Sequence, residues 1–128
     1  MEAALRSRLL DAAAIANAVK RRVDWEVPPQ AGKLPAIVLT MLSDPRPQHM
    51  GGMQATRDSL VRADVWGDDQ AEVAMLREAV VETLVPAATA GEVRFLRSFV
   101  TALRSLPERT ETGVRFRAQI ELRVWHIA

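Results

Sequence analysis

Few residues in this chain have the side chains needed to bind a metal ion or catalyse a reaction. There are two histidines, His49 and His126, and neither has another histidine or a carboxylate at helical spacing. A metal site needs several such ligands close together, so we expect none here. His49 lies in a polar, loop-like segment and is expected to be solvated. His126 lies at one of the alternate positions of the final strand that are otherwise apolar, and it is expected at the rim of the core.

Carboxylates are the next candidates for acid–base chemistry. Asp68 and Asp69 are adjacent, but they precede a helical pattern, where a carboxylate caps the helix and interacts favourably with its dipole. Asp64 lies in the middle of a predicted strand, where a buried carboxylate needs a partner. We expect an ion pair across the sheet or between subunits, and the candidate partners are Arg97, Arg115 and Arg117.

Sequence motifs for nucleotides, cofactors or catalytic nucleophiles do not occur in the chain. There is no G-x-S-x-G elbow, P-loop, dinucleotide fingerprint or H-E-x-x-H. The chain contains no cysteine, which excludes disulfides, thiolate metal sites and cysteine nucleophiles together. The sequence therefore predicts a protein without enzymatic activity, cofactor, metal or small-molecule substrate.

The closing segment carries the most distinctive pattern of the sequence. From Val114 to Val124 apolar or small residues alternate with polar ones, which is typical of a strand with one buried face. The polar positions place Arg115, Arg117 and Arg123 on one face. That face could be solvated, could line a passage for a polyanion through phosphate contacts, or could meet the carboxylates of a second subunit. The residues themselves leave all three interpretations open.

Composition and charge indicate an ordinary globular chain. Its 128 residues include 17 basic and 16 acidic ones, for a net charge of +1, and 48% are hydrophobic. This length fits one domain, residues 1–128, that folds without metals or disulfides. The balanced charge gives no reason to expect nucleic-acid binding. Charged residues interrupt the N-terminal apolar stretch and no apolar run is long enough to span a membrane, so we expect cytoplasmic synthesis and no membrane partner.

The hydrophobic pattern predicts two helices and four main strands. The helices are expected at residues 3–20 and from 69 to about 85, and the strands at 36–42, 54–66, 92–106 and 114–124. A short β-like piece at 23–27 follows the first helix, and turns are expected at 88–91 and 107–113.

This order predicts an α+β domain of the form α-β-β-α-β-β. We expect a mostly antiparallel sheet of about four strands, with the two helices packed on one face. The segment at about 43–53 is rich in proline and glycine and predicts a long, exposed hairpin loop.

Four segments, in this order, resemble the small tail terminator, or tail completion, proteins of long-tailed bacteriophages and phage-derived particles such as prophages and gene transfer agents. They are "RRVDWEVPPQAGKLPAIVLTMLS", "LVRADVWG", the acidic helix from Asp69, and "TGVRFRAQIELRVWHIA". The first contains Pro29-Gln30 and a Leu34-Pro35 that leads into an apolar strand. The resemblance spans nearly the whole chain.

This resemblance implies a structural virion assembly protein. Such proteins form a homo-hexameric ring that caps the tail tube, ends its polymerisation and joins the tail to the head–neck complex. DNA then passes through the lumen of the ring, with possible non-specific contact. The implied partners are further copies of the chain, the tail tube protein and a head–neck or stopper protein. The implied location is the neck-proximal end of the virion tail.

Two sets of residues are then candidates for contact with partners. For contact with a neighbouring subunit or the tail tube they are Arg46, His49, Met50, Met53, Asp64 and Trp66. For the lumen or an adjacent subunit they are Arg115, Arg117 and Arg123. The alternative that the sequence leaves open is a soluble protein-binding adaptor, acting as a monomer or dimer through a charged sheet surface.

Overall fold

The computed structural model describes residues 1–26, 34–46, 48–49, 52–53, 56–110 and 113–127. Its described helices are α1 (Glu2–Asp11), α2 (Ala13–Val19) and α3 (Gln70–Leu84). Its described strands are β1 (Val23–Trp25), β2 (Ala36–Ser43), β3 (Gln48–His49), β4 (Gly52–Met53), β5 (Thr56–Gly67), β6 (Ala88–Ala90), β7 (Val93–Phe95), β8 (Phe99–Ser105), β9 (Glu108–Thr110) and β10 (Gly113–Ile127). The α+β class is confirmed.

The sheet is larger than the predicted four strands, and it is mixed. Among the described residues it has 8 strands, in the order β1-β2-β5-β10-β7-β6, with β8 and β9 also paired to β10. The long strand β10 is antiparallel to β5 on one edge and pairs in turn with β7, β8 and β9 on the other. The short strand β1 is parallel to β2. The expected element order and the expected four-stranded antiparallel sheet are therefore wrong.

The predicted strand at 92–106 is two strands. The chain leaves the ladder at residues 96–98, where the amide of Leu96 donates to the carbonyl of Trp125 and that of Ser98 to the carbonyl of Val85. This break changes which side chains are covered: Phe95 is buried, whereas Phe99 and Leu103 are 53% and 52% exposed. Both segments predicted as turns also contain short strands, β6 and β9, because their backbones extend the ladders of β7 and β10.

The predicted first helix is broken at Ala12, whose backbone is extended. On an unbroken helix Ile15 would lie about 120° around the axis from Leu9. Because of the break, α1 and α2 are oriented differently about their axes, and both Leu9 and Ile15 are fully buried. The sequence pattern did not reveal this break, because several alanines make the whole segment favourable to helix.

The helix at 70–84 and the closing strand match their predicted patterns. Asp69 caps α3 by accepting a hydrogen bond of 3.0 Å from the amide of Ala71. The apolar residues that recur at helical spacing along α3 are buried: Val73, Leu76, Val80 and Leu84. On β10 the even positions from Ala118 to His126 are buried against the same core.

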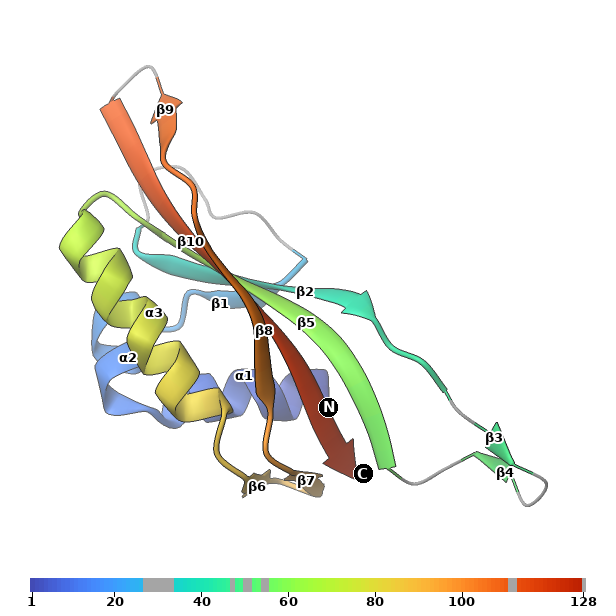
Figure 1. The fold of residues 1–128 in the computed structure, drawn as a ribbon. Helices are drawn as coiled ribbons and strands as arrows, with labels where there is room; N and C mark the ends of the chain where they lie inside the picture. The colour runs from blue at the N-terminus through green and yellow to red at the C-terminus, as the bar shows by residue number, and fades with distance from the viewer. Residues whose placement is uncertain (27–33, 47, 50–51, 54–55, 111–112, 128) are drawn as a thin grey trace.

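The helices lie on one side of the sheet (Figure 1). Their apolar side chains form one core with the inward positions of β5 and β10. The hairpin β3–β4 lies beyond the end of β2 and β5, far from the helices (Figure 1). The other side of the sheet is not covered by any helix of the described part of the chain. We call it the open sheet face.

Gly67 ends β5 where the chain turns into α3, and it has no room for a side chain. A Cβ atom at this position would lie 2.7 Å from Cγ2 of Val73, a buried and β-branched neighbour. We expect Gly67→Ala to lower the free energy of unfolding by about 1–2 kcal/mol, as overpacking does. Urea denaturation measures the loss, and Val73→Ala in the same chain should recover part of it. Equal stability of wild type and Gly67→Ala would contradict this packing.

Helices long and apolar enough to cross a membrane are absent from the described residues. In the same ranges no group of three or more histidine, aspartate and glutamate side chains is placed to hold a metal ion.

Candidate functional site

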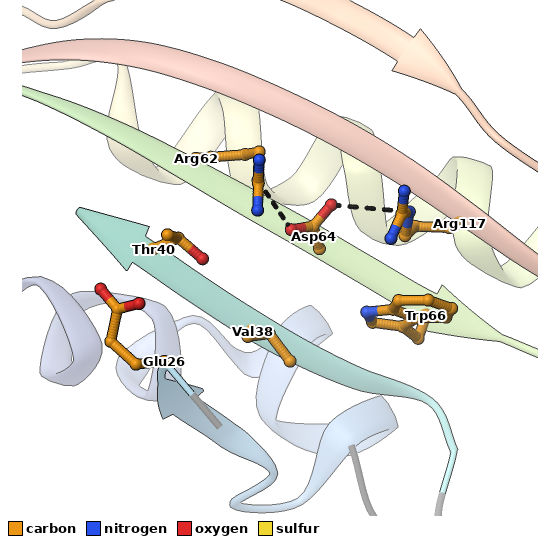
Figure 2. A pocket seen from close by; sticks show the side chains of 7 residues that line it. All are labelled: Glu26, Val38, Thr40, Arg62, Asp64, Trp66 and Arg117. Atoms are coloured by element: carbon orange, nitrogen blue, oxygen red, sulfur yellow. Dashed lines mark hydrogen bonds and ion pairs between the residues drawn. The ribbon is translucent and has the colours of Figure 1, made fainter. Parts of the chain in front are cut away.

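The open sheet face is built by the alternation of strands β2, β5 and β10. Because directly opposed residues share a face, Val38, Asp64 and Gln119 lie side by side across the three strands. A shallow, open pocket of about 270 Å³ lies there. Figure 2 shows its lining residues: Glu26, Val38, Thr40, Arg62, Asp64, Trp66 and Arg117.

Asp64 forms the floor of this pocket and is only 4% exposed. One carboxylate oxygen accepts a hydrogen bond of 3.0 Å from Nε of Arg62. The other lies 3.7 Å from Nε of Arg117, too far for a hydrogen bond. The predicted pairing of Asp64 with an arginine is thus confirmed for Arg117, and Arg62 is a second partner that the sequence did not identify. Two guanidinium groups share one carboxylate, which leaves the group with excess positive charge.

Arg117 is also held by an aromatic ring. Its guanidinium lies 4.7 Å from the ring centre of Trp66, a cation–π distance. Nε of Arg117 is buried and makes no hydrogen bond within the described structure. Trp66 and Asp64 therefore fix the position of Arg117, while part of its side chain, 29% exposed, remains accessible from the pocket.

Ion pairs continue along β10 on the same face. Arg123 is paired with Asp58 of β5, and Arg104 of β8 is 3.0 Å from the carboxylate of Glu121. Arg115 lies opposite Glu108 of β9 in the ladder. The three arginines predicted to share a face do so, and each lies near or opposite an acidic residue.

The residues expected to contact a neighbour or the tail tube fall in two places. Asp64 and Trp66 belong to the open sheet face. Arg46 lies on the segment that leads to the hairpin β3–β4, where it is paired with Asp44 at 2.8 Å. Met50 lies outside the described residues, and so do the side chains of His49 and Met53.

His126 belongs to a buried polar cluster that the sequence did not reveal. Ser59 Oγ donates to Asp44 Oδ1 at 3.0 Å, and His126 Nε2 lies 3.0 Å from the same Oγ. This order of donors assigns the proton of neutral His126 to Nε2. Ser59 and His126 are 0% and 1% exposed, so no substrate can reach them and the cluster is structural. The sequence did contain one indication of this cluster: Ser59 and His126 each lie at alternate strand positions that are otherwise occupied by buried apolar residues.

Burial lowers the pKa of His126, and the nearby positive charge of Arg57 adds to the effect. Nδ1 is buried without a hydrogen-bond partner, so a proton there would place an unpaired charge in the core. The stabilising contribution of neutral His126 is therefore complete above the ordinary histidine pKa of 6.5 and is lost as pH falls through the lower pKa of the folded state.

We expect the free energy of unfolding to fall as the pH is lowered beneath 6.5, the ordinary histidine value. His126→Gln should remove most of this dependence, because an amide does not titrate. Urea denaturation across the pH range measures both. The pKa of the Asp44 carboxyl is also lowered, but this group makes the free energy of unfolding depend on pH only beneath its ordinary value of 3.8. It therefore does not affect the pH range in which His126 titrates. Identical pH profiles for the two chains would contradict this role of His126.

Comparison with known families identifies the chain. The family model described as tail completion protein gp17 matches residues 3–127. The chain belongs to this family. Membership in the tail completion family gives it a structural role in a phage tail, and the predicted resemblance is confirmed.

Solved structures add a comparison of fold to this membership. A chain in the virion of a native gene transfer agent particle is 21% identical, with a TM-score of 0.70 over 100% of this tail completion protein and 95% of that chain. The two share a fold. A chain from Akkermansia muciniphila, solved without its transmembrane region, is 18% identical with a TM-score of 0.36 over 70% of this chain and 44% of that one, and we infer nothing from it. No curated protein sequence matches significantly.

Proposed function

We propose that this tail completion protein forms a homo-hexameric ring that caps the tail tube and ends its polymerisation. The ring joins the tail to the head–neck complex at the neck-proximal end, and DNA passes through its lumen. The observation that carries the proposal is the family match over residues 3–127. The partners in this proposal are further copies of the chain, the tail tube protein and a head–neck or stopper protein.

The shape of the chain supports a role in assembly. The hairpin β3–β4 extends beyond the main sheet and makes no substantial contact with it (Figure 1). We propose that this segment, residues 43–53 with Arg46 at its base, contacts the tail tube or a neighbouring subunit. The open sheet face, with Asp64, Trp66 and Arg117, is a second surface without a partner in the single chain.

Native mass spectrometry of the purified chain, alone and with assembled tail tubes, tests this function. We expect a six-fold assembly in at least one of the two conditions. A matched variant replaces residues 47–54 with a short glycine–serine link, which removes the hairpin and leaves the core residues in place. It should keep the fold, by circular dichroism, and lose at least tenfold in affinity for tubes or for other copies. A chain that stays monomeric at high concentration and ignores tail tubes would contradict the ring and favour the adaptor.

A further inference from the structure

The hairpin β3–β4 is joined to the sheet by two connections, and the outgoing one leaves the sheet at Asp44. The ladder of β2 with β5 ends at the pair Ser43 and Leu60, after a shift of register. The returning connection leads into β5, which pairs with β10 from its first residue, Thr56. The hairpin makes no substantial contact with other described elements (Figure 1). The contacts of Asp44 therefore decide where the outgoing connection points.

Side chains hold Asp44 in place where the backbone ladder stops. One carboxylate oxygen accepts a hydrogen bond of 3.0 Å from Ser59 Oγ, and the other accepts one of 2.8 Å from Arg46 Nη2. Ser59 Oγ also lies 3.0 Å from Nε2 of His126, and Ser59 and His126 are both buried. The polar cluster of Asp44, Ser59 and His126 thus ties the base of the hairpin to the long strands β5 and β10.

The sequence makes the outgoing connection stiff. Asp44 and Arg46 each precede a proline, in the order Asp44-Pro45-Arg46-Pro47. A residue before proline is restricted to extended backbone, and the φ angle of Pro45 is fixed by its ring. The ion pair of Asp44 with Arg46 restricts the same residues further. Because a stiff connection keeps the direction of its first residue, a hold on Asp44 sets the direction of this connection towards the hairpin.

The chemistry of the cluster suits this task better than it suits a core. A hydroxyl and an imidazole lose water on burial, and hydrogen bonds only offset that cost. Apolar side chains at the positions of Ser59 and His126 could fill the space without it, but they could not bind the carboxylate of Asp44. A satisfied polar network instead fixes one arrangement of its members. Here that arrangement includes the residue from which the hairpin leaves the sheet.

We propose that Asp44, held by Ser59 and His126, is a positioning residue for the hairpin β3–β4. It keeps the hairpin in the direction that the contact with the tail tube or a neighbouring copy requires. A segment that is already in place loses less conformational freedom on binding and therefore binds more tightly. The proposal rests on the function proposed above and names the residues that prepare its hairpin contact.

Spin labels measure the position of the hairpin without any partner. The chain has no cysteine, so Gln48→Cys with Glu82→Cys places one label on the hairpin and one on the exposed side of α3. Electron paramagnetic resonance then gives the distribution of distances between the labels. We expect one narrow distribution in the otherwise unchanged chain. Asp44→Ala and Ser59→Ala, each added to this pair, should widen it at least twofold, because each breaks the bond between Asp44 and Ser59.

Binding is measured with the same substitutions in the chain without labels. The variant with residues 47–54 replaced shows which contact needs the hairpin, that with tail tubes or that with other copies. We expect Asp44→Ala and Ser59→Ala to weaken that same contact at least tenfold. The two together should be no weaker than the stronger single variant, because they break one shared bond. Circular dichroism checks each fold, and Asp44→Ala leaves both buried members of the cluster in place.

Two control variants separate the role of the cluster from charge. Asp44→Asn keeps an oxygen that can accept from Ser59 but loses the ion pair with Arg46, so it should retain the narrow distribution and bind within about twofold of wild type. Asp68→Ala removes an equal charge from an exposed position beyond the opposite end of β5, and it should behave as wild type. A merely structural role of Asp44 would change stability and leave the width of the distribution as it is.

Three results would overturn the proposal. A distribution that is already broad in wild type, or equally narrow in Asp44→Ala and Ser59→Ala, would mean that the cluster does not hold the hairpin, and the ring would stand. A widened distribution with unchanged binding would mean that the direction of the hairpin does not matter. If replacing residues 47–54 affects neither contact, the proposed role of the hairpin and this inference fall together.

Discussion

Replacing Arg8 with methionine should lower the free energy of unfolding by about 3 kcal/mol, because hydrogen bonds to charged donors each contribute about 1.5–3 kcal/mol. Arg8 is 7% exposed, and its Nη2 donates to the carbonyls of Thr83 and Pro86 at 2.6 and 2.8 Å. Its guanidinium also lies 4.8 Å from the ring centre of Phe95. Methionine keeps the apolar stem and leaves the carbonyl of Thr83, in the last turn of α3, and that of Pro86, just beyond the helix, without their donor.

The position of Arg8 explains how a buried cation is tolerated. Burial lowers its pKa, and no carboxylate within the described ranges forms an ion pair with it. The carbonyls at the C-terminal end of α3 carry the negative end of the helix dipole and take the place of a carboxylate.

Urea denaturation followed by circular dichroism measures the effect of Arg8→Met. Arg6→Met is the matched control, because Arg6 also donates to backbone carbonyls, those of Val23 and Arg21, but from a less buried position. We expect the control to lose less than about 1 kcal/mol, the ordinary net value of a hydrogen bond. If Arg8→Met were as stable as wild type, Arg8 would not be the link between α1 and the end of α3.

Asp64→Ala should cost about 2 kcal/mol, because it leaves two adjacent guanidinium groups without their shared carboxylate. The loss is smaller than for a fully buried pair, since Arg62 and Arg117 are 33% and 29% exposed and water screens part of their repulsion. The local excess of positive charge makes this loss decrease as salt is added.

A second arginine substitution tests the cause of the Asp64 effect. In a chain that already carries Arg62→Gln, the cost of Asp64→Ala should fall by about half, as expected for neighbours that share one interaction. The exposed pair of Arg77 and Glu78 serves as a control, and Glu78→Ala should cost less than about 0.5 kcal/mol. A cost for Asp64→Ala that is equal in both chains and independent of salt would mean that the carboxylate acts through packing alone.

Much of the fold could be predicted where the determining contacts are local. Strand β10 and helix α3 each have one buried face, and that face shows in the sequence as a regular spacing of apolar residues. On α3 these residues are Val73, Leu76, Val80 and Leu84, and the buried face of each element is where the spacing indicates. The cap at Asp69 is equally local. The family also could be predicted, because its motifs lie in order along the chain.

The errors come from contacts between residues that are distant in sequence. The interruption at 96–98 depends on the hydrogen bond from the amide of Ser98 to the carbonyl of Val85. Strands β6 and β9 form because their backbones pair with β7 and β10. The break at Ala12 depends on how α1 and α2 pack on α3. None of these has a period or a motif that a single sequence displays.

The candidate site was predicted in its parts but not in its arrangement. Parity placed Arg115, Arg117 and Arg123 on one face, and Arg117 was among the expected partners of Asp64. The second partner, Arg62, lies two residues from Asp64 along β5 and was not among the expected partners. The link between Ser59 and His126 joins residues 67 apart in sequence, so only the register of β5 with β10 reveals it.

The most direct test of the central claim, that this chain ends the growth of a tail, is the distribution of tail lengths in particles assembled without it. Electron microscopy of particles from a host in which its coding sequence is deleted should show tails of abnormal and variable length, detached from heads. The wild-type chain supplied from a second copy should restore uniform, head-bound tails. Tails of normal length joined to heads in the deletion strain would contradict the claim.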